Sequence, residues 1–508
     1  MEDRKSTVQY SQKIHINVVI FVCSTSFLSV AGVLQSRIRS YIDLQTENNE
    51  VLFIMVQALA AGAGSELKQE VRSDYFRYLI PTLVGQIAHS FYCMADVFFV
   101  GATVGSNGLA ALNVALPIFT LYSAFSIMVG VGTATTVSVL AGQRDTENSN
   151  RVFTQSMVLL GAVGLLLTLL TSVFIRQVAR LFGATDLIID GVVAYMRPIN
   201  ALAFVYIFSG ALGVIVRADG NPKLVMVAGT CGNLCNIFLD YLFIMVLGMG
   251  VFGAGLATIL GHCVTVSLLA LHFLLRAGQL RFVRHFFSPA FCRRVLQNGV
   301  GSSILELSAG FIVLLFNLVL LRVSGENAVA IFSVLSNIAY VGKGMFNGMA
   351  QAAQPIISTS YGAGRFDKVR LVNRYAMLTA AVFSTLIYGA LLLFPAQIIG
   401  IFVEPSLIPA GSRALSLYFL SFPFTGLNTV MMYYFQSLER VKYTSLIAIL
   451  RGVVFISGAL LLFSTLWGET GVWLALFAAE CTTYLIFWPV RSRFDHRMAA
   501  VHPRLALR

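Results

Sequence analysis

Long apolar runs dominate this chain. From Phe76 onward, twelve runs of about twenty or more mostly apolar residues follow one another with short polar connections. They cover residues 76–100, 108–140, 152–175, 192–216, 223–247, 253–275, 297–321, 328–358, 372–395, 412–437, 443–466 and 471–490. A helix needs about 20 such residues to cross a bilayer, and its backbone hydrogen bonds are satisfied within it. The pattern predicts an all-α polytopic membrane protein with twelve transmembrane helices.

The charged residues agree with this fold and indicate an orientation. Only 11% of the 508 residues are charged, whereas soluble domains carry about 25%. The formal net charge of +12 comes largely from short loops: twenty Lys and Arg residues lie in one set of alternate connections and five in the other. The richer set faces the cytoplasm in most membrane proteins. We therefore expect a protein of the plasma or inner membrane with a cytoplasmic C-terminus, and no nucleic acid partner.

Residues 1–73 precede the regular runs and allow two interpretations. Ile16–Leu34 is apolar and flanked by basic residues, which favours an extra membrane segment. The next apolar stretch, residues 51–63, is shorter than the lower limit of about 17 residues for a span. Alternatively, translation begins later, for instance at Met55.

The two halves of the remaining chain resemble each other. At an offset of 220 residues, Leu109–Ala111 corresponds to Val329–Ile331, and Ser138 corresponds to Ser358. Six helices per half is an even number, so the repeats run the same way and are related by a pseudo-two-fold axis along the membrane normal. The predicted domains are an N-terminal extension (1–73), an N-lobe (74–276), a basic linker (277–296), a C-lobe (297–490) and a basic tail (491–508).

Several polar residues interrupt the apolar runs of the first half. Asn236 and Asp240 are four residues apart and share a helix face. With alternating helix directions, Asp96, Asp240 and Thr258 lie about 6, 10 and 8 Å from the outer ends of their helices. Oxygen ligands at one depth suit a hard cation or a shared proton. Asn236 and Thr258 alone are also explained as helix-to-helix hydrogen bonds, but an intramembrane carboxylate indicates function.

The motifs around these residues resemble one known family. Asp96-Val97-Phe98-Phe99-Val100-Gly101, the Asn236–Asp240 segment, Gly253–Thr258, Gln351–Pro355 and Tyr361–Gly364 together are similar to the MATE family of multidrug and toxic compound extrusion antiporters. The similarity covers about residues 74–490, and it is greatest to the branch of bacterial drug-efflux pumps. The seventh helix lacks the proline that the family commonly carries near Gly301.

This resemblance implies a function. Two six-helix lobes would enclose a cavity for an amphiphilic, often cationic compound, which is exported in exchange for H⁺ or Na⁺. The family's N-lobe cation site matches Asp96, Asn236, Asp240 and Thr258, and the bending proline of its first helix matches Pro81. We expect no enzymatic activity, cofactor or metal site; the partners are the transported molecule and membrane lipid, and the protein is a monomer.

The C-lobe offers further candidates for coupling or substrate contact. Glu306 resembles an acidic residue of some family members, and either this role or structural pairing explains it. Lys343 is interpreted as a partner for Glu306 or Glu480, or as a residue lining the cavity. Amphipathic or soft side chains suit varied aromatic cations and add as cavity contacts Gln351, Gln354, Met349 and Tyr122.

Three other classes of protein remain to be distinguished. A flippase for lipid-linked sugars has a similar architecture, but it would need clustered Arg in the cavity to hold pyrophosphate. A membrane-embedded transferase needs a His/Asp or metal constellation at one face, which the seven histidines do not form. A channel needs a selectivity filter, and no such segment repeats.

Overall fold

The computed structural model of the chain describes residues 65–505. The two interpretations of the N-terminal segment therefore fall on residues that lie almost entirely outside the described part. The chain divides into two compact units, Met1–Glu70 and Val71–Arg508. The second unit contains the predicted membrane domain.

Within residues 65–505 all regular structure is helical, and no strand occurs. The helices of the first half are α3 (Ser65–Thr103), α4 (Ser106–Gly142), α5 (Thr146–Val173), α6 (Ile175–Leu181), α7 (Ile189–Ala201), α8 (Ala203–Ala218), α9 (Pro222–Asp240), η1 (Tyr241–Val246) and α10 (Gly250–Leu274). Those of the second half are α11 (Pro289–Ser324), α12 (Glu326–Gly362), α13 (Phe366–Leu393), α14 (Pro395–Gly400), η2 (Pro405–Leu407), α15 (Ile408–Phe419), α16 (Phe422–Ser437), α17 (Val441–Ile449), η3 (Leu450–Val454) and α18 (Phe455–Leu505).

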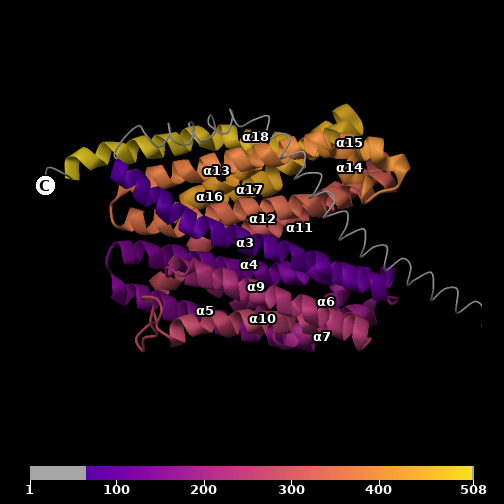
Figure 1. Cartoon of the computed structure of the whole chain (residues 1–508), viewed down its shortest axis with the longest axis horizontal. Coiled ribbons are helices and arrows are strands. Elements are labelled where there is room, and N and C mark those ends of the chain that lie inside the picture. The colour runs from indigo at the N-terminus through magenta and orange to yellow at the C-terminus, as the bar shows by residue number, and fades with distance from the viewer. Residues whose placement is uncertain (1–64, 506–508) are drawn as a thin grey trace, which may run out of the picture. The chain divides into compact units, whose positions relative to one another are not determined.

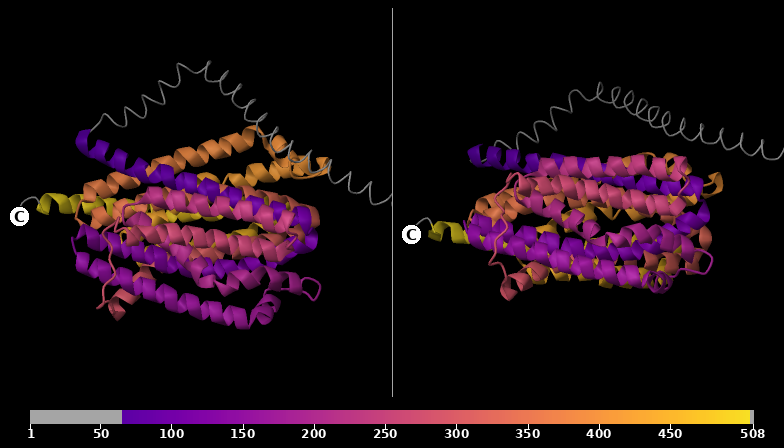
Figure 2. Two further views of the ribbon diagram at one scale, coloured as in Figure 1. Left: turned by 60° about the horizontal axis from the view of Figure 1, so that its bottom comes forward. Right: turned by 90° about the horizontal axis from the view of Figure 1, so that it is seen from below.

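The long helices run side by side along one axis, as the views in Figure 2 show. Ten described helices are long and apolar enough to cross a membrane, and the bent pair α7–α8 makes an eleventh span. The continuous segment Val441–Met498 contains two of the predicted spans, because Gly468 takes a non-helical φ of 57° and breaks α18 into two helices. A positive φ of this kind is readily adopted only by glycine. The structure thus accommodates the twelve predicted transmembrane helices.

The two halves form two lobes with matching elements. We call α3–α10 the N-lobe and α11–α18 the C-lobe; Figure 1 shows most N-lobe helices in the lower and the C-lobe helices in the upper part of the bundle. α4 and α12 both have 37 residues, and α5 and α13 both have 28. α9 and α17 both continue into a π-helical turn. The sequence repeat therefore reflects a repeat of structure.

Backbones of the two lobes meet near the end of the bundle that carries the C-terminal part of α18, called here the C-terminal end. A Cβ added to Gly299 of α11 would lie 1.7 Å from the Met128 carbonyl oxygen of α4. One added to Gly362 of α12 would lie 2.0 Å from the Val139 oxygen of α4. Glycine at these positions lets helices approach closely, which is how membrane helices associate.

Candidate functional site

The first predicted group of polar residues comes together within the N-lobe. Asp96 lies on α3, Asn236 and Asp240 on the last turns of α9, and Thr258 on α10. Counted to the helix ends at Thr103, Val246 and Gly250, the two aspartates and Thr258 are roughly 9–12 Å from the same end of the bundle. The two aspartates and Thr258 are therefore at nearly one depth, on the side away from the C-terminal end, and Asn236 lies one turn of α9 deeper in the bundle.

This group is buried, and much of its hydrogen-bonding capacity is unused. Asp240 is 0% exposed and Asn236 2%. Within the described part of the chain, both carboxylate oxygens of Asp240, both side-chain polar atoms of Asn236 and Oδ1 of Asp96 have no hydrogen-bond partner. Burying an unpartnered polar group costs free energy. Five such atoms in one place indicate a site built to receive an additional donor or cation.

Helix packing explains why these groups converge. Gly232 and Gly261 let α9 and α10 touch, because a Cβ on Gly261 would lie 2.8 Å from the Gly232 oxygen and 3.0 Å from Cβ of Asn236. Gly255 allows α10 to approach α7, because a Cβ added at Gly255 would lie 2.1 Å from the backbone carbonyl oxygen of Tyr195. The π-helical turn of η1 begins directly after Asp240. Such turns often occur at functional sites.

Tyr195 on α7 is a fifth member of this group, which the sequence reasoning missed. Its side chain is 95% buried, and its hydroxyl interacts with both Asp96 and Thr258. Thr258 Oγ1 also donates to the carbonyl oxygen of Ala254 at 2.9 Å. The tyrosine therefore links α3 to α10 across the site. No sequence signal singles it out, because α7 also carries the polar residues Asp190, Arg197 and Asn200.

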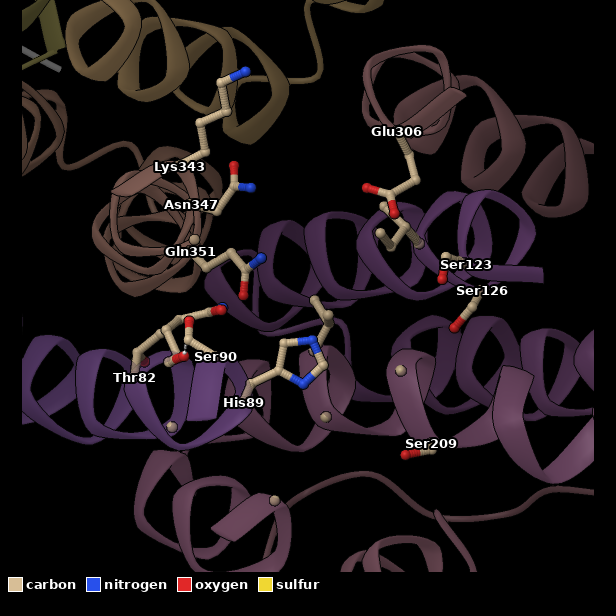
Figure 3. A pocket seen from close by; sticks show the side chains of 18 of the residues that line it. Thr82, His89, Ser90, Ser123, Ser126, Ser209, Glu306, Lys343, Asn347 and Gln351 are labelled. Atoms are coloured by element: carbon tan, nitrogen blue, oxygen red, sulfur yellow. Dashed lines mark hydrogen bonds between the residues drawn. The ribbon is translucent and has the colours of Figure 1, made fainter. Parts of the chain in front are cut away.

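A cavity of about 530 Å³ lies between the lobes. Pro81, the predicted hinge, lines it within the continuous helix α3, and Asn236 and Thr258 line it from the N-lobe. Two of the four residues in the N-lobe group therefore line the cavity, and neither aspartate does. Figure 3 shows polar side chains entering from both lobes, among them Ser123 and Ser209 from the N-lobe and the C-lobe residues Glu306, Lys343 and Gln351.

One of the C-lobe acidic residues has a different partner from the one considered in the sequence analysis. Arg451, in the π-helical turn η3, forms the ion pair with Glu480 at 2.8 Å, and both side chains are 6% exposed. Asn428 donates to the second carboxylate oxygen of Glu480 at 2.7 Å. Lys343 forms no ion pair with Glu306 or Glu480. The pairing that stabilises Glu480 is thus structural.

Three of the proposed cavity contacts lie elsewhere. Gln354 is 2% exposed and donates across the lobe interface to Thr135 Oγ1 at 2.8 Å. Met349 is buried and Tyr122 faces the N-lobe interior, where its hydroxyl donates to Thr171 and Asn200. These positions were misassigned because a residue's type does not indicate which face of a helix it occupies.

Gln351 lines the cavity on its C-terminal side, where the two lobes come into contact. Its Oε1 accepts a 2.6 Å hydrogen bond from Arg217 at the end of α8. Nearby, Asn298 of α11 donates to Thr136 of α4 at 3.0 Å. Both contacts join the lobes on the C-terminal side of the cavity. This end of the cavity is therefore closed by direct contacts between the lobes.

The family assignment rests on the whole membrane domain. The MatE family model matches residues 81–242 and matches again at residues 300–461. The chain belongs to the MatE family. Its two matched ranges begin at 81 and 300, an offset of 219 residues, so each lobe is one copy of the MatE repeat. With its many apolar helices, it is an integral multi-pass membrane protein.

Other MatE-related proteins are similar over nearly their full lengths. The Multidrug export protein MepA of Staphylococcus haemolyticus is 23% identical over 82% of this chain and 92% of its own. MepA of Staphylococcus aureus is 22% identical over 84% and 95%. A solved multidrug resistance MATE family transporter of the MOP superfamily, in an outward-facing conformation, has a TM-score of 0.81 at 25% identity and covers 86% of this chain and 99% of its own.

Proposed function

We propose that this protein is a secondary antiporter that exports amphiphilic, often cationic compounds in exchange for H⁺ or Na⁺. One observation carries the proposal: the buried group of Asp96, Asn236 and Asp240 has five polar atoms without a partner, and it reaches, through Asn236, a cavity that both lobes line. A cation bound at this group and a molecule in the cavity would act on the same helices. The similarity to multidrug export proteins supports the choice of cargo.

The coupling follows from electrostatics. With an empty site, two carboxylates carry negative charge among apolar helices, at a high cost in free energy. A proton or Na⁺ reduces that cost and therefore favours any arrangement of α3, α9 and α10 that buries the site more deeply. A ligand shifts such an equilibrium by its difference in affinity for the two states. In this way, binding of the cation is coupled to release of the cargo within one transport cycle.

The orientation of the cycle is part of the proposal. The basic loops and the C-terminal end face the cytoplasm, following the charge asymmetry of the sequence. In that orientation the contacts of Arg217 with Gln351 and of Thr135 with Gln354 close the cytoplasmic side. The aspartates lie in the outer half, where H⁺ or Na⁺ arrives down its gradient. The structure then corresponds to an outward-facing state of a monomeric transporter.

Gradient-driven flux tests this function. Purified protein in liposomes would be given a fluorescent cation, ethidium, with a pH gradient or a Na⁺ gradient imposed in turn. We expect one gradient to drive ethidium accumulation in the wild type, and Asp96→Asn and Asp240→Asn each to reduce it by at least tenfold. Asp190→Asn is the matched control, because Asp190 forms an exposed ion pair with Arg176 far from the cavity.

The flippase is the alternative that the same preparation can reveal. Its central cavity would have to hold a pyrophosphate, and Arg217 and Arg451 do line the cavity here. Both are already engaged, by Gln351 and by Glu480, which argues against that role. A folded wild type that moves no ethidium under either gradient but scrambles a lipid-linked pyrophosphate would overturn the antiporter proposal.

A further inference from the structure

The charges around the cavity do not match a site for simple cations. Five acidic or basic side chains line it in addition to two histidines. Arg451 and Glu480 neutralise each other in their ion pair. The remaining three are Arg217, Lys343 and Glu306, two positive and one negative. With Arg217 bound to Gln351 at the closed end, the open part of the cavity presents one cation and one anion.

Glu306 and Lys343 remain separate from each other. Within the described chain, neither forms an ion pair or a hydrogen bond with another side chain. Figure 3 shows Lys343 on α12 and Glu306 on α11 entering the cavity from different sides. Two side chains of opposite type that could have paired thus line the same cavity without pairing.

The surroundings of Glu306 suit a cationic group. Its carboxylate shares the cavity with Tyr206, Tyr340 and Tyr433. These three tyrosines line the cavity from α8, α12 and α16. A carboxylate among aromatic rings attracts a delocalised organic cation by charge and by cation–π interaction.

The surroundings of Lys343 suit an anionic group. Asn347 and Gln351 follow it at intervals of four residues, so the three side chains occupy one face of α12 and line the cavity together. Lys343 also lies within electrostatic range of the Arg451–Glu480 pair, whose own charges cancel. An ammonium group with amide donors one and two turns away can hold a carboxylate.

We propose that the cargo is a zwitterionic amphiphile whose cationic part binds at Glu306 and whose anionic group binds at Lys343. This inference rests on the proposed function, because it names the class of molecule that the same cavity exports. An unpaired Lys343 would repel a purely cationic compound. It would instead attract a molecule with an additional carboxylate. Glu306 and Lys343 together therefore favour cargo that carries one positive and one negative charge.

Equilibrium binding of two forms of one dye tests this proposal. A rhodamine with a free carboxylate is a zwitterion at neutral pH, and its methyl ester is a cation with the same ring system. Fluorescence polarisation with the purified protein would give the Kd of each form. We expect the wild type to bind the free acid at least threefold more tightly than the ester. Lys343→Met should weaken binding of the acid about tenfold and leave the ester unchanged or tighter.

Matched variants separate this effect from a general defect. Lys343→Arg keeps the charge and should retain the preference for the acid. Lys442→Met makes the same change at an exposed lysine outside the cavity and should alter neither Kd. Glu306→Gln should weaken binding of both forms, because both carry the cationic ring.

Two results would contradict the inference. One is a wild type that prefers the ester; the other is a Lys343→Met variant, with an unchanged unfolding temperature, whose ratio of the two Kd values equals that of the wild type. Either result leaves the antiporter proposal standing if ethidium transport is driven by a gradient. Failure of that flux, by contrast, would remove the proposed function itself.

Discussion

Tyr195 is the residue that ties the N-lobe group together. Its hydroxyl interacts with Asp96 of α3 and Thr258 of α10, so its removal would leave the Asp96 carboxylate less well positioned. We expect Tyr195→Phe to raise the H⁺ or Na⁺ concentration needed for half-maximal ethidium transport by about tenfold, equivalent to about 1.4 kcal/mol. Flux measured against ion concentration in liposomes would show this shift.

A second buried tyrosine provides the control. The hydroxyl of Tyr122 also donates to two side chains, Thr171 and Asn200, within the same lobe. Tyr122→Phe should lower stability by about 1 kcal/mol and leave the ion dependence unchanged. Equal shifts in ion dependence for the two variants would mean that Tyr195 acts only through stability.

The Arg451–Glu480 ion pair is expected to contribute to stability. Glu480→Gln leaves the Arg451 charge buried without its partner and should reduce the free energy of unfolding by about 3 kcal/mol. Adding Arg451→Gln removes that charge and should restore most of the loss. Denaturant unfolding in detergent measures both values. Additive losses in the double variant would show that the two side chains do not depend on each other.

At the scale of helices, the sequence predicted spans better than their ends and breaks. The apolar runs located the long helices, and the repeat between the two halves is present in the structure as the equal lengths of α4 and α12. The gap between the predicted spans 443–466 and 471–490 located the break at Gly468, whereas the π-helical turns η1 and η3 were not predicted. The depth of Asp96, Asp240 and Thr258 followed from helix direction alone. The role of Tyr195 could not be predicted in this way, because its partners lie on other helices and its contacts depend on how those helices pack.

The packing of α11 on α4 allows a test of lobe closure. A Cβ at position 299 would meet the Met128 carbonyl oxygen at 1.7 Å, so Gly299→Ala should destabilise the closed C-terminal end by about 1–3 kcal/mol. Spin labels at the exposed positions Gln143 and Lys442, one in each lobe, report on this end. We expect longer label-to-label distances in the variant.

Gly310 on the same helix provides the comparison. A Cβ there would meet no atom within 4 Å, so Gly310→Ala should reproduce the wild-type distances. If Gly299→Ala also kept the wild-type distances while folding normally, close approach of α11 and α4 would not be what holds this end shut.

On the scale of the whole molecule, the two lobes meet along one end and enclose a cavity that Asn236 and Thr258 of the N-lobe group line. In an antiporter, binding of the cation must weaken binding of the cargo. By linkage, the cargo then lowers the affinity for the cation by the same factor. Lobe architecture and the position of the carboxylates were predictable from repeats and polar interruptions. The separation of Lys343 from Glu306, which determines the proposed cargo, was not, because it depends on which charged residues find partners.

The most direct test of this account is the Kd of ethidium for the purified protein, measured while H⁺ and Na⁺ concentrations are raised in turn. Cation binding at Asp96 and Asp240 would remove negative charge beside the cavity and favour release. We therefore predict that one of the two ions weakens ethidium binding by at least tenfold in the wild type, and that Asp240→Asn abolishes the dependence while Asp190→Asn keeps it. A wild-type Kd that is unchanged by either ion would contradict the coupling.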